Sequence, residues 1–205
     1  AFGKYIQDPI NEITMASSTN DITWVNIGDK GYVYGAEFEI KKRLFDFGGT
    51  NTNNLFGGLN VSYMKTNQEI DAEKIRRETN GTINTNFEDT ESSFTGASDL
   101  LLNTDISYVT ECNEDKGMTA TLAYTHYSDR LYALGSQKGN LIDKGMGSLD
   151  FILKTKIHKN FALDFAARNI VNPEFRRIQD NKSGVVDAVT YKRGAFFSLG
   201  AKYTF

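Results

Sequence analysis

The sequence has little cysteine, little proline and no long apolar run, and each shortage removes a class of protein. Cys112 is the only cysteine among 205 residues, so no disulfide can form within the chain. No apolar run reaches 18 residues, so the sequence predicts no membrane-spanning helix. The formal net charge of −3 lacks the basic excess typical of nucleic-acid-binding proteins, and we expect no nucleic-acid partner.

The residues that are abundant favour strands and turns. Two prolines stand beside 18 glycines, 14 phenylalanines and 10 tyrosines. Aromatic residues are enriched in strands, and proline removes a hydrogen-bond donor from a sheet. A chain of this length is also long enough for one sizeable domain. The composition therefore predicts a single all-β domain.

The last residues of the chain show the strand pattern most clearly. Apolar residues occupy every second position, at Phe197, Leu199, Ala201, Tyr203 and Phe205. Small or polar residues stand between them, at Ser198, Gly200, Lys202 and Thr204. A period of two places the two sets on opposite faces of a strand. A terminal strand of this kind needs a partner on its open edge, which closure of the sheet into a barrel provides.

The same period predicts eight strands, at residues 2–6, 32–44, 55–66, 100–109, 118–127, 147–157, 161–169 and 191–205. Residues 22–25 begin the approach to the second strand, and 28–31 form a bend. The connections alternate between long or medium loops (8–21, 67–97, 133–146, 173–189) and short turns (45–54, 112–117, 158–160). All short turns then lie at one end of the sheet, as they do in outer-membrane barrels. Residues 71–78, inside one long loop, are predicted as a short helix.

Charged and aromatic residues agree with a membrane barrel. The charged residues within the strands fall on the polar face, at Glu37, Glu39, Asp105, Asp150, Lys154, Asp164, Arg168 and Lys202. We expect no charge in mid-strand on the apolar face, because a lysine or arginine facing lipid costs about 2–4 kcal/mol near the midplane. Two aromatic girdles are predicted, from Tyr34, Tyr63 and Tyr124 at the loop end and from Tyr108, Phe161, Tyr203 and Phe205 at the turn end. The predicted fold is an antiparallel transmembrane β-barrel with its apolar face outward.

No group of residues predicts catalysis, a metal site or a cofactor. His126 and Asp129 lie three positions apart, so on a continuous strand they point to opposite faces and do not meet. His158 stands in a tight turn without a carboxylate or cysteine cluster. Cys112 has acidic neighbours, which disfavour a reactive thiolate. We therefore expect a protein that is not an enzyme.

Five stretches together resemble the C-terminal part of the TonB-dependent outer-membrane receptors, most closely those of Bacteroidetes-type bacteria. They are Tyr5-Ile6-Gln7-Asp8-Pro9-Ile10, the Gly-hydrophobic-Glu strand at 31–40, Ser128-Asp129-Arg130-Leu131-Tyr132, Ala167-Arg168-Asn169-Ile170-Val171-Asn172-Pro173, and the ending at 191–205. Each stretch alone is weakly specific, but their order and spacing cover nearly the whole chain.

The resemblance implies that residues 1–205 form roughly the last eight strands of a barrel of about 22 strands in the cell outer membrane. It implies TonB-driven uptake of a scarce solute, such as a siderophore, a metal complex, a glycan or a peptide. The expected partners are the lipid bilayer, the rest of the barrel and its plug, the TonB complex acting through the missing N-terminal part, and the barrel-assembly machinery. Tyr203 and Phe205 correspond to the assembly signal. Glu37, Glu39, Lys154, Arg168 and Lys202 are candidates for the lumen wall, where they either brace a plug or keep the wall wet.

Two other readings remain open at this point. The first is a self-contained eight-stranded membrane barrel with a structural or adhesive role, its small lumen filled by side chains. The second is a soluble, lipocalin-like binding protein whose apolar face points inward. Sorting of the loops by length argues against the second reading.

Overall fold

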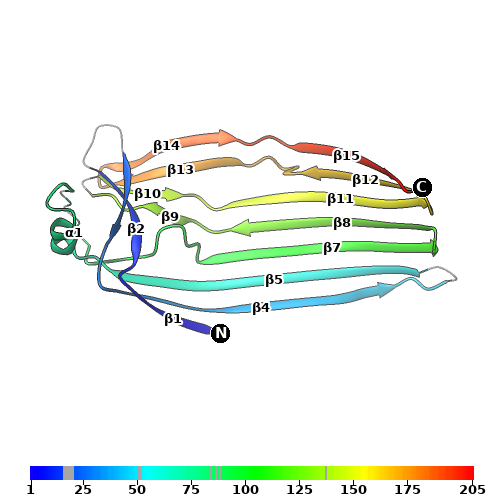
Figure 1. The fold of residues 1–205 in the computed structure, drawn as a ribbon, viewed down its shortest axis with the longest axis horizontal. Coiled ribbons are helices and arrows are strands. Elements are labelled where there is room, and N and C mark those ends of the chain that lie inside the picture. Colours follow the sequence, from blue (N-terminus) through cyan, green and yellow to red (C-terminus); the bar gives the residue numbers. More distant parts are fainter. Residues whose placement is uncertain (16–20, 50–51, 84, 86, 88, 137) are drawn as a thin grey trace.

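The computed structural model describes residues 1–15, 21–49, 52–83, 85, 87, 89–136 and 138–205. Its elements, drawn in Figure 1, are β1 (Phe2–Gln7), β2 (Ile10–Thr14), β3 (Ile22–Asn26), β4 (Lys30–Asp46), β5 (Thr52–Glu69), α1 (Ala72–Glu78), β6 (Glu91–Ser92), β7 (Leu100–Asn113), β8 (Lys116–Tyr127), β9 (Arg130–Ala133), β10 (Asn140–Asp143), β11 (Met146–His158), β12 (Phe161–Arg168), β13 (Glu174–Asn181), β14 (Gly184–Lys192) and β15 (Phe196–Tyr203). The predicted loops 8–21, 45–54, 67–97 and 133–146 each include positions outside the described residues.

The main sheet confirms the predicted all-β, antiparallel class. Its strands follow the order β1-β4-β5-β7-β8-β11-β12-β15, with the short β6 also pairing with β5. These eight strands are those that the alternation predicts. The sheet is open, because β1 and β15 are its two edges and do not pair with each other. β1 also covers only part of β4: Phe2 lies opposite Gly35, so within the described residues 36–46 of β4 have no partner on their outer side.

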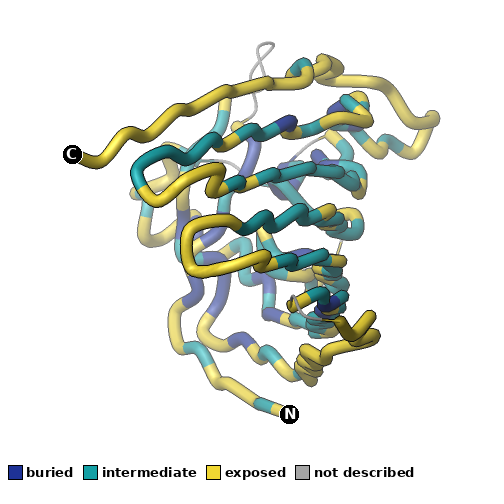
Figure 2. Tube along the Cα trace, turned by 90° about the vertical axis from the view of Figure 1, so that its right-hand side faces the viewer, coloured by how far each residue is buried: buried dark blue, intermediate teal, exposed yellow. Residues whose placement is uncertain are grey.

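The short turns lie together at one end of the main sheet, as predicted. Figure 1 shows the β4–β5, β7–β8 and β11–β12 turns at the right of the view, and α1, β2, β9, β10 and the start of β14 at the left. We call the two ends the turn end and the loop end. In Figure 2, which looks at the turn end, the two chain termini lie at opposite edges of the sheet.

Several predicted loops contain strands, and these predictions were wrong in part. Residues 173–189 hold most of a hairpin, β13–β14, which belongs to a second, four-stranded sheet in the order β14-β13-β10-β9. Strand β14 leads in line into β15 (Figure 1). Tyr191 therefore belongs to β14 and not to the terminal strand. Residues 22–25 pair with β2 in a separate two-stranded sheet instead of leading into β4. β10 lies within the predicted loop 133–146, whereas the bend near residue 29 and the helix near 71–78 are confirmed.

Two asparagines build the corner where β12 leaves the main sheet. Asn169 and Asn172 have positive φ angles of 54° and 42°, a region that asparagine tolerates better than most residues. The side-chain amide of Asn169 donates to the carbonyl oxygen of Gly194 at 2.8 Å, and Gly194 N–H donates to Asn172 Oδ1 at 2.9 Å. These two hydrogen bonds connect the β12–β13 corner to the junction between β14 and β15.

The register puts the apolar positions of the eight strands on one face, which we call the apolar face. One row of partners runs from Ile106 through Leu122, Phe151 and Ala167 to Phe197. No described segment covers this face: Leu122 is 44% exposed, and Leu199 on β15 is 77% exposed. The other side is the polar face.

Two lysines of the apolar face differ in their distance from the ends of the sheet. Lys42 lies opposite Gly57 toward the turn end, and Lys65 lies opposite Tyr34 toward the loop end. Lys65 forms an ion pair with Asp99. Lys65 therefore stands near the loop end, whereas Lys42 shares a cross-strand row with Ile106 and Leu122, against the prediction that the apolar face carries no charge in mid-strand.

The hydrophobic core lies at the loop end, away from the faces of the main sheet. Its buried members come from β2, β3, α1 and the segments next to them: Ile13, Val25, Ile27, Ile70, Ile75 and Leu134. We call this folded group of loop-end segments the cap. Ile13 and Leu134 also form an isolated parallel bridge that links β2 to the end of β9. Among the described residues, no helix is long and apolar enough to cross a membrane.

We expect Gly31→Ala to loosen the cap where it meets the sheet. A Cβ at Gly31 would lie 2.4 Å from the Phe94 ring, whereas a Cβ at Gly3 would meet nothing within 4 Å. Overpacking costs about 1–3 kcal/mol, and a ring on a loop can move, so we expect the lower end of that range. Hydrogen exchange of residues 91–96 should accelerate in Gly31→Ala. Equal exchange in Gly31→Ala and Gly3→Ala would contradict this contact.

Candidate functional site

The polar face forms a continuous hydrophilic wall across the sheet. One row crosses five strands with polar side chains only, at Glu39, Asn60, Asn103, Thr125 and Ser148. Near it, the Ser107 and Thr121 hydroxyls lie 2.8 Å apart on neighbouring strands. A wall of hydroxyls, amides and charges suits contact with water or with a polar occupant.

The five candidate wall residues all lie on the polar face, but the structure does not bring them together. Glu37 and Glu39 are on β4, toward one edge of the sheet. Lys154, Arg168 and Lys202 are on β11, β12 and β15, toward the other edge. Register confirms the shared face, since Lys154 lies opposite Asp164, and Lys202 opposite Ala162.

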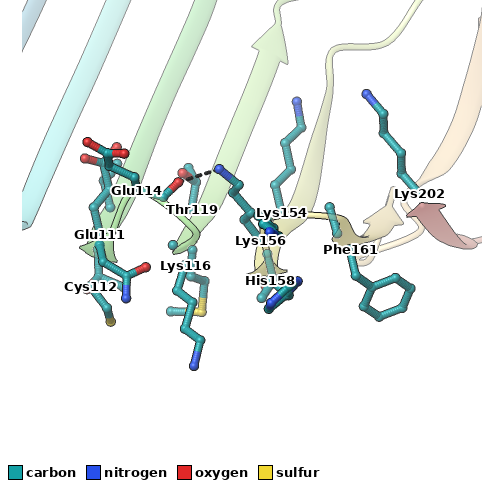
Figure 3. Close-up of a pocket in the computed structure, with 18 of the residues that line it drawn as sticks. Glu111, Cys112, Glu114, Lys116, Thr119, Lys154, Lys156, His158, Phe161 and Lys202 are labelled. Atoms are coloured by element: carbon teal, nitrogen blue, oxygen red, sulfur yellow. Dashed lines mark hydrogen bonds between the residues drawn. The ribbon is translucent and has the colours of Figure 1, made fainter. Parts of the chain in front are cut away.

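A hollow of the polar face lies at the turn end. It is a cavity of about 760 Å³ between the β7–β8 turn, the β11–β12 turn and the end of β15. Figure 3 shows the Lys154 and Lys202 side chains projecting in the same direction, away from the turns, while Lys116 and His158 point the opposite way. Lys156 bends toward the β7–β8 turn and donates to the carbonyl oxygen of Glu114 at 2.5 Å. We call this hollow the turn-end cavity.

The terminal aromatic residues lie at the same end of the sheet but on the apolar face. Tyr203 stands opposite Phe161 on β12, and its ring meets the Phe205 ring edge-on at 5.1 Å. Phe205 is fully exposed. Phe47 and Tyr108 make a similar edge contact at 6.2 Å near the β4–β5 turn. The predicted aromatic residues of the turn end are thus placed at that end.

His126 and Asp129, the two residues considered for catalysis, have different partners. His126 lies opposite Leu102, on the apolar face, and its ring stacks against Tyr124. The Asp129 carboxylate forms an ion pair with Lys144 and accepts from Gly145 N–H at 2.6 Å, away from His126. Within the part of the chain that the structure describes, no group of three or more histidine, cysteine or acidic side chains could hold a metal ion.

In the cap, a buried lysine joins three segments. The Lys74 side chain on α1 is only 5% exposed, and its Nζ donates to Asp8 at 2.5 Å, to Asp29 at 2.8 Å and to the carbonyl oxygen of Gly28 at 3.0 Å. Asp71 caps α1 by accepting from Lys74 N–H at 2.9 Å. Helix α1 is therefore fixed to the chain on both sides of the β2–β3 hairpin.

The Lys74 contacts shift the pKa values of the groups involved. Burial lowers the pKa of Lys74, but the hydrogen bonds that Lys74 donates to Asp29 and Asp8 outweigh it, so the pKa of Lys74 lies above its ordinary value. The hydrogen bond from Lys74 lowers the pKa of Asp29. Both shifts favour the charged forms that hold the helix in place.

A second buried charge holds the β9–β10–β13 part of the cap. The Asp143 side chain is 1% exposed and accepts from Arg177 Nε at 2.5 Å and from Arg130 Nη2 at 3.2 Å. The Arg177 guanidinium also stacks on the Tyr132 ring, at 3.1 Å from its centroid. Asp143, on β10, therefore connects its own strand to β9 and to β13.

A third network brings the cap over the polar face. Gln68 shares this face with Glu37 and Glu39, because it lies opposite Gly31 in the same register. Its amide exchanges hydrogen bonds with Asn11 of β2, at 2.5 and 3.0 Å. The Asn11 Oδ1 also accepts from Thr95 N–H at 3.0 Å. The loop-end segments thus fold over the polar side of the sheet.

Sequence reasoning missed these cap networks. The partners of Lys74 lie 45 and 66 positions away, and those of Asp143 are 13 and 34 positions away. No local spacing rule connects residues at such distances. The one usable signal was Asp71 before the short helical stretch, which marks a helix start.

Comparison of the chain with protein-family models, with curated proteins and with solved structures finds no match.

Replacing Asp143 should destabilise the cap far more than replacing an exposed carboxylate. Asp143→Asn leaves Arg130 and Arg177 without their anion, and breaking a buried pair costs about 3–5 kcal/mol. We expect about 3 kcal/mol, because Arg130 is partly exposed. Asp187→Asn, which breaks only the exposed pair with Arg176, should cost about 0–1 kcal/mol. Hydrogen exchange of the amides in β9, β10 and β13 measures the destabilisation in both variants. Similar protection in the two variants would contradict the role of Asp143 as the anion that holds these strands.

Removal of the Lys74 ammonium should release α1 and make its stability independent of pH. In the native chain, the contribution of Asp29 is present above its unfolded pKa near 3.8 and is lost as pH falls through the lowered folded value. The contribution of Lys74 is present below its unfolded pKa near 10.5 and is lost as pH rises through the raised folded value. We expect Lys74→Met to raise the opening of residues 72–78 about tenfold at neutral pH.

Arg76→Ala is the control, because Arg76 pairs only with the exposed Glu73. Hydrogen exchange at pH 3, 7 and 9 separates the two variants. A native helix that is equally protected at pH 3 and pH 7 would refute the role of Asp29.

Proposed function

We propose that residues 1–205 form part of the wall of a TonB-dependent receptor in the cell outer membrane, which takes up a scarce solute. The observation that carries this proposal is the uncovered apolar face, kept in register across eight strands while the hydrophobic core lies elsewhere. The protein acts as a transporter and not as an enzyme.

The exposed apolar face favours a hydrocarbon surrounding over water. Contiguous exposed apolar patches beyond a few hundred Å² are rare on soluble monomers and mark contact with a partner or a membrane. Phe38, Ile106 and Leu199, on three different strands, are each at least half exposed. A lipocalin-like protein would instead bury this face in its interior. A bilayer supplies the missing contact along the whole face.

The aromatic residues on the apolar face are spaced to fit a membrane. Tyr34 lies opposite Lys65, and Tyr108 lies opposite Leu55, so ten residue steps of β5 separate the two rows. That is about 33 Å along the strand, or about 25 Å along the membrane normal at a tilt of about 40°. Outer-membrane barrels have an apolar band of about 25 Å between their aromatic girdles. Lys65, in the loop-end row, reaches the headgroup level.

The two open edges support a larger barrel rather than a barrel of eight strands. A closed eight-stranded barrel requires β1 to pair with β15, and these strands are the opposite edges of the sheet. Unpaired backbone groups are not stable in hydrocarbon, so further strands must satisfy the edges of β4 and β15. We propose that the rest of a barrel of about 22 strands provides them.

The cap and the terminal aromatics fit the two ends of such a receptor. The loop end carries the ordered cap, which reaches over the polar side and is the first part that an external solute meets. The exposure of Tyr203 and Phe205 at the turn end supports their recognition by the barrel-assembly machinery. TonB engages another part of the receptor, and the plug fills the lumen beside the polar face.

A charge placed on the apolar face should block assembly, whereas the same charge on the adjacent polar-face residue should not. Leu122→Arg places a guanidinium in mid-strand toward lipid, at a cost of about 2–4 kcal/mol. Thr121→Arg, one residue away, points to the polar face and is the matched control. The readout is the amount of heat-modifiable, full-length protein in outer membranes. Equal assembly of both variants would refute the lipid-facing assignment.

Transport is tested in cells that lack the full-length receptor. We expect loss of growth when one of the candidate solutes (an iron–siderophore, another metal complex, a glycan or a peptide) is the limiting nutrient. Expression of the Thr121→Arg receptor should restore growth, and dissipation of the proton-motive force should abolish uptake. Undiminished uptake of all four solute classes without the receptor would overturn the transport proposal.

A further inference from the structure

The lysines at the loop end of the apolar face are neutralised by carboxylates of the chain itself. Lys30 lies four residues before Tyr34 on β4, on the same face, and its ammonium lies 3.9 Å from the carboxylate of Glu69. Lys65, in the loop-end aromatic row, forms an ion pair with Asp99. Little positive charge therefore remains at this end for the headgroups of the adjacent leaflet.

The lysines at the turn end of the apolar face have no such partners. Lys116 lies four residues before Ala120, which is opposite Tyr108, so Lys116 shares the apolar face. Neither Lys116 nor Lys42 forms a hydrogen bond or an ion pair within the described part of the chain, and both are exposed. Asp115, next to Lys116 in the β7–β8 turn, forms no ion pair with it. Positive charge is thus left free at this end.

A β-bulge brings a histidine to the same place. Lys156 lies opposite Ala162 and His158 lies opposite Phe161, so β11 contains one extra residue at this point. Without the bulge, His158 would lie on the polar face with Lys156, because residues two apart on a strand share a face. Figure 3 shows Lys116, His158 and Phe161 pointing to the same side. The bulge therefore adds an imidazole to the turn end of the apolar face.

Lys116 and His158 are close neighbours across two paired strands. Gly117 of β8 lies opposite Lys156 of β11. Lys116 and His158 come next toward the turns, on strands that are about 4.8 Å apart. A lysine ammonium and an imidazole N–H both donate hydrogen bonds, and phosphate oxygens accept them. One phosphate group can therefore accept from both side chains.

Aromatic side chains place this pair at headgroup depth. Phe161 lies opposite His158 and Tyr203 lies opposite Phe161, so the row continues across β12 and β15 with aromatic rings. Tyr203 and Phe205 are exposed on the same face. In membrane proteins such rings lie at the level of the lipid headgroups. The two donors are therefore level with the phosphates of the turn-end leaflet.

We infer that Lys116 and His158 bind the headgroup phosphate of an anionic glycerophospholipid in the leaflet at the turn end. This inference rests on the proposed function, because it needs the apolar face to lie in a bilayer. An anionic headgroup such as phosphatidylglycerol brings no ammonium group near Lys116, whereas a zwitterionic headgroup does. The loop end thus neutralises its own lysines, and the turn end takes its negative charge from lipid.

Native mass spectrometry of the full-length receptor tests the inference. The receptor is extracted from outer membranes, checked for heat modifiability, freed of lipid in detergent, and titrated with phosphatidylglycerol or with phosphatidylcholine of the same acyl chains. We expect phosphatidylglycerol to bind more tightly, and an equal concentration of inorganic phosphate not to displace it. A cation near a membrane surface contributes about fivefold in affinity for anionic lipid, so Lys116→Gln should weaken this binding about fivefold.

Matched variants separate this site from other lipid contacts of the receptor. Lys116→Arg keeps the charge and should bind phosphatidylglycerol as the native chain does. His158→Phe keeps a ring but removes the donor, so it should weaken binding. Lys30→Gln removes a cation that already has its own carboxylate, so it should leave binding unchanged.

Four results would overturn the inference: equal affinity for the two lipids, no loss of binding when Lys116→Gln and His158→Phe are combined, an equal loss in Lys30→Gln, or displacement of the lipid by inorganic phosphate. Heat modifiability shows that each variant is an assembled receptor, so these results leave the proposed transport function intact. That function fails separately, through the comparison of Leu122→Arg with Thr121→Arg.

Discussion

The structure depends on one constraint: each strand must keep its apolar positions on the same face as those of its neighbours. A slip of one residue in any pairing would move a whole strand's apolar set to the polar face. The β-bulge in β4 illustrates how closely the constraint is kept. Arg43 lies opposite Phe56 and Phe45 opposite Leu55, so one extra residue is accommodated and Phe45 returns to the apolar face.

This constraint leaves the main sheet without a core of its own. Soluble β proteins bury one face of a sheet against another layer. Here the apolar face stays open in the described residues, the cap covers the polar face only at the loop end, and side chains such as Ile13, Ile27 and Ile75 form the core in the cap. The chain therefore has two parts of different build: a sheet whose apolar face no described segment covers, and a cap that folds around its own apolar cluster.

The sequence was sufficient for the parts of the fold that obey a local period. All eight strands of the main sheet, their antiparallel order and the sorting of turns and loops follow from alternation and turn residues. The hairpin β13–β14 escaped this reasoning because its residues are exposed throughout β14, with valines at both 185 and 186, so no clean alternation marks a face.

The sequence was sufficient to place the candidate wall residues on the polar face. It did not show which of them lie close together in the folded sheet. Alternation tells which face Glu37 and Lys202 share, whereas the distance between them depends on how many strands separate β4 from β15. The cap networks were harder still, since Asp143 and Lys74 acquire their partners only after the loops have folded against one another.

The arrangement of charge differs between the two ends of the sheet. At the loop end the buried charges Lys74 and Asp143 are fully engaged by partners within the cap, so they fix loop positions and leave little charge for a ligand. At the turn end Lys154 and Lys202 remain unengaged over an open cavity. A buried pair that is satisfied stabilises a structure, whereas a free cation facing a hollow favours an anionic partner. The loop end is therefore built to hold its own shape, whereas the turn end keeps two cations that no described residue engages.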